Sequence, residues 1–128
     1  MQLLWGRAVL YGLLTEAILM IVFVIYLAIG TPTSVVTATV IVGSFALPLW
    51  FATILGRRLH AGFILHGLLI GSAAFVIYMA MYAIGRVFQP NAGPQPVAYW
   101  IAHALKLAGG AVGGAIASRT RSARAAGV

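Results

Sequence analysis

Apolar residues in this chain gather into four long runs that are separated by short polar breaks. The runs cover residues 8–29, 35–55, 61–84 and 97–117. Each run is close to the roughly 20 residues that an α-helix needs to cross a bilayer. The pattern therefore predicts an all-α membrane protein with four transmembrane helices, in which residues 1–118 form a single domain.

The polar breaks have compositions that end helices. Residues 30–34 predict a tight turn, in which Pro32 fixes φ and the hydroxyl groups cap the next helix. Residues 56–58 form a short charged break, and residues 89–96 contain three prolines and one glycine, which exclude a helix. After the fourth run, residues 119–128 predict a basic cytoplasmic tail, which we expect to fray.

Two short sequences recur at a single offset of 55 residues. Gly-Leu-Leu at residues 12–14 recurs at residues 67–69, and Ala-Ile-Gly at residues 28–30 recurs at residues 83–85. The shared offset predicts two helical hairpins related by a parallel repeat, and internal repeats are common in transporters. A chance match between two helices rich in leucine and alanine explains the same observation equally well.

Composition excludes a water-soluble globule. The chain is 62% hydrophobic and 7% charged, whereas soluble domains carry about 25% charged residues. It has no cysteine, so disulfides and thiolate metal sites are excluded. The net charge of +7 does not indicate nucleic-acid binding, because the basic residues flank apolar runs and form no clustered basic face. The lipid bilayer and its anionic head groups are the expected partners of such charges.

The arginines are distributed unevenly between the two sides of a four-helix bundle. With four spans, the N-terminal segment, the second break and the C-terminal segment share a side, and the other side carries Arg86 alone. The shared side carries six arginines: Arg7, Arg57, Arg58, Arg119, Arg121 and Arg124. Because lysine and arginine accumulate on the cytoplasmic side of membrane proteins, we expect both termini in the cytoplasm.

Small residues repeat every four positions on the third and fourth runs. The glycines with this spacing are Gly67, Gly71, Gly109, Gly110, Gly113 and Gly114. Such spacing lets membrane helices approach closely, so we interpret these glycines as helix-packing residues within the bundle. The fourth run carries two such faces, and one of them could also contact a partner in a homo-oligomer or a larger membrane complex.

Glu16 is the only acidic residue, and it lies inside the first apolar run. It is roughly 13 Å from the inner end of its helix, close to the middle of a bilayer core about 30 Å thick. An ionised side chain at that depth costs at least about 2.5–3.5 kcal/mol. Glu16 is therefore expected to be protonated, paired, or next to a water-filled cavity.

Lys106 is the first partner to consider for Glu16, because it lies at a similar depth in the fourth run. However, helical side chains lean toward the N-terminus of their own helix. The two side chains would then lean apart, and Lys106 could extend outward instead. A hydroxyl group or a histidine of another span, or a cavity water, is an alternative partner for Glu16.

Two histidines lie within the apolar runs, His66 near the inner edge and His103 nearer the outer edge. They differ too much in depth to bind one haem between them. With one carboxylate and no cysteine, we expect no metal site and no cofactor. His103 shares a helical face with Lys106. The candidate intramembrane polar site consists of Glu16, Lys106, His103 and His66.

In the stretch Gly12–Ile18, Glu16 resembles the essential glutamate in the first helix of the small multidrug resistance transporters. Those transporters are four-helix proteins of similar size. The likeness is one of position only. Residues 67–85 lack the aromatic pattern that surrounds the drug site in that family, and residues 89–96 are longer than its loops.

A second resemblance spans most of the chain. The two Gly-Leu-Leu sequences, the Gly-Arg-Arg break and the paired glycines of the fourth run are similar to those of a group of small bacterial four-helix membrane proteins of uncharacterised activity. This resemblance implies a four-helix fold and a bacterial cytoplasmic membrane, and it implies no activity.

The sequence contains no catalytic motif, so we expect no enzyme. Our first hypothesis is a non-enzymatic integral membrane protein that acts as a packing or assembly partner, or as a small subunit of a membrane complex. The alternative is a small oligomeric proton-coupled transporter that uses Glu16, because intramembrane acids mark ion pathways. A membrane enzyme or a haem anchor is a third hypothesis.

Overall fold

The computed structural model describes residues 4–125 and residue 127, and it is helical throughout its regular structure. Its four helices are α1 (Trp5–Ala28), α2 (Thr33–Gly56), α3 (Phe63–Phe88) and α4 (Val97–Ala125). All four are long and apolar enough to cross a membrane. The prediction of an all-α protein with four candidate transmembrane helices is confirmed, and we describe the chain as an integral membrane protein.

The helices extend beyond several of the predicted boundaries. α3 continues to Phe88, and α4 continues to Ala125, although we expected the basic segment after residue 118 to fray. Residues 119–125 contain no glycine or proline, and alanine and arginine favour helix. The helix therefore continues out of the apolar run. The remaining residues of the predicted tail, 126 and 128, lie outside the described part of the chain.

The connection between α1 and α2 is the tight turn that the sequence predicts, but its capping differs. Gly30 has a φ of 70°, which glycine adopts without strain. Pro32 occupies the N-cap position, and its carbonyl accepts hydrogen bonds from Val35 N and Val36 N. No hydroxyl group caps the helix. The expected hydroxyl cap is wrong because Thr33 already lies within the first turn of α2.

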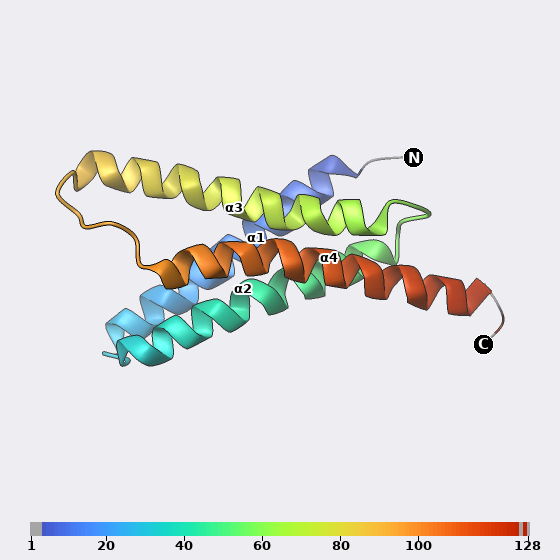
Figure 1. The fold of residues 1–128 in the computed structure, drawn as a ribbon, viewed down its shortest axis with the longest axis horizontal. Coiled ribbons are helices and arrows are strands. Elements are labelled where there is room, and N and C mark those ends of the chain that lie inside the picture. Colours follow the sequence, from blue (N-terminus) through green and yellow to red (C-terminus); the bar gives the residue numbers. More distant parts are fainter. Residues whose placement is uncertain (1–3, 126, 128) are drawn as a thin grey trace.

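The four helices run alternately up and down, so three parts of the chain lie together at one end. The start of α1, the α2–α3 connection and the end of α4 lie at the right of Figure 1, which we call the termini end. The α1–α2 turn and the α3–α4 connection lie at the opposite end, the loop end. α4 packs closely on both α2 and α3, whereas α1 packs mainly on α3.

The two glycine series of α4 face two different helices of the same chain. Gly109 and Gly113 lie against α2, where an added Cβ would collide with the carbonyl oxygens of Phe45 and Leu49. Gly110 lies against α3, where its added Cβ would collide with the carbonyl of Gly67. Both series are therefore occupied by packing inside the bundle.

The remaining glycines of this set bring α3 and α4 together over several turns. An added Cβ on Gly114 would collide with the carbonyl oxygen of Phe63, and one on Gly71 with that of Lys106. The Gly71 contact lies beside the polar residue Lys106. Close backbone approach therefore determines how deeply Lys106 is placed in the bundle.

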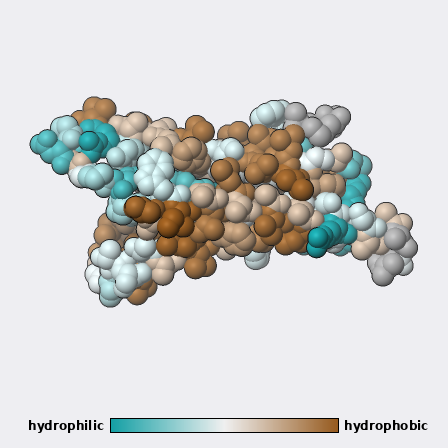
Figure 2. All heavy atoms as spheres, viewed as in Figure 1, coloured by the Kyte–Doolittle hydropathy of each residue, from teal (hydrophilic) through white to brown (hydrophobic). Residues whose placement is uncertain are grey.

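The outer surface is apolar in the middle and polar at both ends. Figure 2 shows hydrophobic residues over the central part of the visible face and hydrophilic residues concentrated at the two ends. Large apolar side chains such as Ile21, Val42 and Val76 are exposed in the central parts of their helices. Such a surface suits contact with lipid chains and does not suit contact with water.

Candidate functional site

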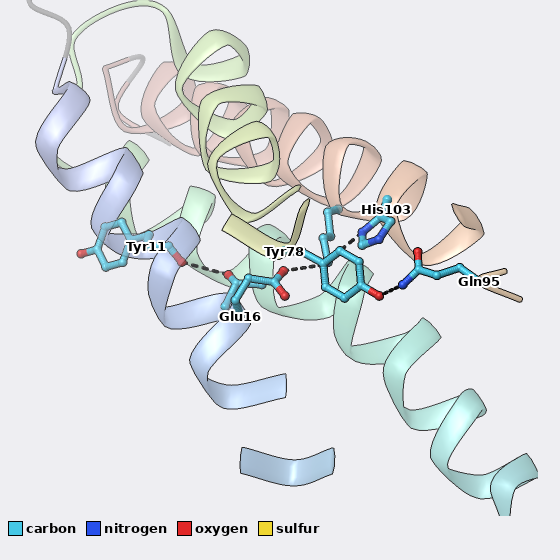
Figure 3. Close-up of polar contacts among 7 residues, drawn as sticks. Tyr11, Glu16, Tyr78, Gln95 and His103 are labelled. Carbon is cyan, nitrogen blue, oxygen red and sulfur yellow. Dashed lines mark hydrogen bonds and ion pairs between the residues drawn. The ribbon is translucent and has the colours of Figure 1, made fainter. Parts of the chain in front are cut away.

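Glu16 and Lys106 form an ion pair inside the bundle. The side chains come from α1 and α4, and Lys106 Nζ donates a hydrogen bond to Glu16 Oε1. Only 3% of Glu16 and 2% of Lys106 is exposed. The only acid of the chain and its only lysine are therefore partners. Figure 3 shows Glu16 directed from α1 toward Tyr78 and His103.

This pairing differs from the geometry expected from side-chain direction alone. α1 and α4 do not pack against each other in the described residues, so the pair crosses the interior between two helices that are not neighbours. The close approach at Gly71 holds the backbone of Lys106 deep in the bundle. The flexible four-carbon stem of lysine then spans the remaining distance. The length of the side chain outweighs the lean of its Cα–Cβ bond.

His103 lies one turn before Lys106 and extends the cluster toward the loop end. Lys106 Nζ lies 3.3 Å from His103 Nδ1. Because an ammonium group can only donate, Nδ1 is the acceptor, and the ring proton is assigned to Nε2. His103 Nε2 has no hydrogen-bond partner among the described residues. The ring thus presents an unpaired N–H donor in a buried position.

Tyr78 connects this cluster to the α3–α4 connection. Its ring centre lies 4.3 Å from that of His103 and 5.1 Å from Lys106 Nζ, the latter within the distance of a cation–π contact. The Tyr78 hydroxyl accepts a hydrogen bond from Gln95 Nε2, as Figure 3 shows. The residue couples the charged pair to a loop at the surface.

A cavity of about 450 Å³ extends from the ion pair to the loop end. It reaches the surface there, because Gly93, Pro94 and Pro96 line it and are exposed. Figure 2 shows the molecule notched at this end. The polar lining consists of Glu16, Ser44, Tyr78, Tyr82, Gln95, Tyr99, His103 and Lys106. The apolar lining includes Leu19, Met20, Phe23, Val40, Met81 and Ala102.

Three buried side-chain polar atoms in the described chain lack a hydrogen-bond partner, and all three belong to residues that line this cavity. They are Ser44 Oγ, Gln95 Oε1 and His103 Nε2. A buried polar group without a partner costs about 1–3 kcal/mol. Concentration of these atoms around one cavity is typical of a site where a ligand or water completes the hydrogen bonds.

Packed apolar side chains close the bundle on the other side of the ion pair. A core cluster of Ala8, Ala52, Leu55, Leu59 and Ile70 occupies the half of the bundle toward the termini end. None of these residues lines the cavity. The site is therefore reached from the loop end and is sealed from the termini end.

α2 contains an interior proline beside the cavity. Pro48 lies one turn after Ser44, and both residues are fully buried. Proline has no N–H, so the Ser44 carbonyl lacks its usual partner in the helix, and such positions are where helices bend. α2 thus lacks one backbone hydrogen bond next to the floor of the cavity.

His66 lies apart from this cluster and has a structural role. Its Nε2 accepts a hydrogen bond of 3.1 Å from Leu4 N, and its Nδ1 lies 2.7 Å from Gly62 O. The first N–H groups of a helix lack partners within the helix. His66 therefore fixes the start of α1 to the start of α3 and does not contribute to the cavity.

The structure brings together three of the four residues of the candidate polar site and adds others. Glu16, Lys106 and His103 meet, whereas Tyr78 and Ser44 were not singled out from the sequence. The signal for Tyr78 was present, since Tyr78 and Tyr82 are one turn apart on α3, and both line the cavity. Ser44 gave no signal, because serine is common within membrane helices.

The described residues include no group of three or more histidine or acidic side chains that could hold a metal ion. His66 uses both ring nitrogens in contacts to the backbone, so it is not arranged as a haem ligand. Comparison with protein-family models, with curated proteins and with solved structures finds no match to this chain.

Proposed function

We propose that this chain is a proton-coupled membrane carrier that binds a small organic anion at Lys106 and a proton at Glu16. The observation that carries this proposal is the ion pair at the floor of a cavity that reaches one end of the bundle. Charged residues within membrane helices are costly and mark ion or substrate pathways. Helix packing alone gives no reason to retain both charges.

The hydrogen-bonding groups around the cavity favour an anion. Lys106 has an ammonium group, His103 presents an N–H donor, and the Ser44 hydroxyl can donate. Three donors that line one cavity suit a carboxylate or another group that accepts hydrogen bonds. The apolar and aromatic walls suit a ligand with a hydrocarbon part.

The ion pair supplies a mechanism for coupling to protons. When the anion binds the ammonium group of Lys106, the carboxylate of Glu16 loses its partner. An unpaired carboxylate near the middle of the membrane costs about 2.5–3.5 kcal/mol, so Glu16 takes a proton from water in the cavity. Release of the anion lets the ion pair form again, and the proton leaves. One anion and one proton then move together without net charge.

Movement of the site between the two sides of the membrane requires a change of shape. The cavity is open at the loop end and closed by the core cluster toward the termini end. Bending of α2 at Pro48 would separate Ala52 and Leu55 from their neighbours in that cluster. Alternation between these two shapes is the conformational change that a carrier needs.

The remaining proposals concern orientation and assembly. Six arginines at the termini end against Arg86 at the loop end support an orientation with both termini in the cytoplasm. A bacterial cytoplasmic membrane is proposed as its location. The two hairpins are proposed to be related by the 55-residue repeat, and the carrier to work as an oligomer. A pure assembly role has less support, because the glycine series that suggested it are occupied inside the chain.

Proteoliposomes that contain a pH-sensitive dye test the proposed function. Under an inward proton gradient, we expect addition of sodium lactate to accelerate acidification relative to protein-free liposomes. Betaine and tetraethylammonium chloride should have no such effect. Glu16→Gln should abolish the lactate-dependent acidification. The control Arg119→Gln also replaces one charged side chain by glutamine, although of opposite sign and at an exposed position, and it should retain the acidification.

Three outcomes would contradict the proposal. The first is lactate-dependent acidification that is unchanged in Glu16→Gln. The second is acidification driven by tetraethylammonium in place of lactate, which would exclude an anion site. The third is the absence of solute-dependent acidification with every compound, although circular dichroism shows that the reconstituted protein retains its helical content.

A further inference from the structure

A second cavity lies at the termini end, between the end of α2 and the last turns of α4. Its volume is about 460 Å³, and it is lined by Thr53, Arg57, Thr120, Arg121 and Arg124, together with small residues. Arg57 directly follows α2, whereas Arg121 and Arg124 belong to α4, and all three line one space. This cavity shares no residue with the first one.

The arginines in this cavity have no acidic side chain as a partner among the described residues. Glu16 is the only acidic side chain, and it is bound to Lys106 on the opposite side of the core cluster. Arg121 donates a hydrogen bond to the carbonyl oxygen of Leu59, which fixes its guanidinium group at the cavity. A guanidinium group has five N–H donors in a fixed geometry that suits phosphate oxygens. The cavity is therefore arranged to bind an anion from outside the chain.

The height of the cavity matches the head-group layer of a membrane. Arg57 follows the 24 residues of α2 directly, so it lies roughly 36 Å along that helix from its start, beyond a hydrocarbon core about 30 Å thick. Arg124 lies near the end of the 29 residues of α4, at a similar height. Basic pockets at this level bind the head groups of anionic lipids.

Each of the two helices presents an exposed apolar side chain on the face that leads to the cavity. On α2, Trp50 precedes Arg57 by seven residues, which places both on one face, and 65% of Trp50 is exposed. On α4, Ile116 precedes Thr120 and Arg124 by four and eight residues, again on one face, and 43% of Ile116 is exposed. Apolar surface toward the membrane core and arginines at its edge suit a phospholipid better than a free phosphate.

We propose that this cavity binds the phosphodiester group of an anionic phospholipid, with the lipid chains lying along α2 and α4 past Trp50 and Ile116. The guanidinium groups of Arg57, Arg121 and Arg124 surround the phosphate. The Thr120 hydroxyl donates to Ile116 O, so the arginines alone supply donors to the phosphate. The site is independent of the carrier activity proposed above, and it ties the end of α4 to the lipid leaflet on that side.

Quenching of Trp50 fluorescence by phosphatidylglycerol with brominated chains tests this proposal. The measurement uses the full chain in nanodiscs, in a Trp5→Phe and Trp100→Phe background, so that Trp50 is the only tryptophan that reports. We expect brominated phosphatidylglycerol to quench Trp50 at low mole fractions in phosphatidylcholine. Brominated phosphatidylcholine should quench only in proportion to its abundance.

Two charge-matched double variants separate a defined site from diffuse attraction. Arg57→Gln with Arg124→Gln removes two arginines of the cavity whose side chains form no hydrogen bond with the described residues. A hydrogen bond to a charged group contributes roughly tenfold in affinity, so we expect the affinity of the cavity for phosphatidylglycerol, read from the quenching curve, to fall about 100-fold. Arg58→Gln with Arg119→Gln removes the same charge from the same end, outside the cavity. This control should keep most of the affinity for phosphatidylglycerol.

The following results would overturn the proposal. Equal loss of quenching in the two double variants would mean that the attraction is diffuse. Equal quenching by the two brominated lipids would mean that the site does not select the anionic head group. Displacement of the lipid by millimolar inorganic phosphate would mean that the cavity takes a free anion and that the lipid chains contribute nothing.

Discussion

Replacing one member of the Glu16–Lys106 pair should destabilise the bundle far more than replacing both. Glu16→Gln leaves the ammonium group of Lys106 buried without a counter-charge, and Lys106→Met leaves the carboxylate of Glu16 in the same position. Both side chains are almost completely buried, so water does not screen the remaining charge. The double variant leaves no uncompensated charge.

The burial of the pair determines how large the change in unfolding free energy should be for each variant. Removing one partner of a buried ion pair costs about 3–5 kcal/mol, whereas replacing the whole pair by neutral side chains of similar size is often close to neutral. We therefore expect each single variant to lose about 3 kcal/mol or more of unfolding free energy. The double variant should lose less than either single variant, so the coupling energy of the pair should exceed about 3 kcal/mol.

Reversible unfolding in mixed micelles measures these free energies. The fraction of denaturing detergent is raised, and the loss of helix is followed by circular dichroism for the wild type, both single variants and the double variant. Glu16→Gln combined with Arg119→Gln serves as the control cycle, and its effects should simply add because Arg119 is exposed and distant from the pair. If both single variants lost less than about 1 kcal/mol and their effects added in the double variant, the pair would not be a buried ion pair.

Two further predictions concern packing and capping. Gly67→Ala should destabilise the bundle by about 1–3 kcal/mol, because the new Cβ collides with the carbonyl of Gly110. The control Gly85→Ala, where nothing lies within 4 Å of the added Cβ, should be neutral or slightly stabilising. Equal effects of the two variants in the same unfolding assay would refute this packing. His66→Phe should lower the free energy of unfolding by about 1–2 kcal/mol, because it removes the acceptor for Leu4 N. Amide hydrogen exchange should accelerate in the first turn of α1. Unchanged exchange there would contradict the capping role of His66.

The helices could be predicted from the sequence because a bilayer allows few alternatives. An apolar run of sufficient length with polar breaks satisfies its backbone hydrogen bonds only as a helix. The ends of the helices were less predictable where a helix continued beyond its run of apolar residues. Residues 119–125 continue α4 because their helix propensity is adequate, and hydropathy alone contains no information about that.

The site was predictable in its residue types and not in its contacts. Glu16 and Lys106 stood out because charges are rare in this chain, but their distance depends on which helices are neighbours. Side-chain direction on a single helix suggested that they lean apart. The contact of Gly71 with the backbone of Lys106 sets the depth of α4, and this depth is a property of two helices together.

One feature of the composition links the two sites. The chain has one acid and one lysine, and the ion pair uses both, so the seven arginines have no counter-charge on any side chain of the protein. Six of the seven lie at the termini end, where repulsion among them would oppose close approach of α2 and α4. Gly56 and Ala117 nevertheless bring these two helices together beside Arg57 and Arg121. Anionic lipids of the surrounding membrane would reduce this repulsion, so the stability of the termini end should depend on the anionic lipid content. The stability of the Glu16–Lys106 ion pair should not depend on it, because the two charges neutralise each other inside the bundle.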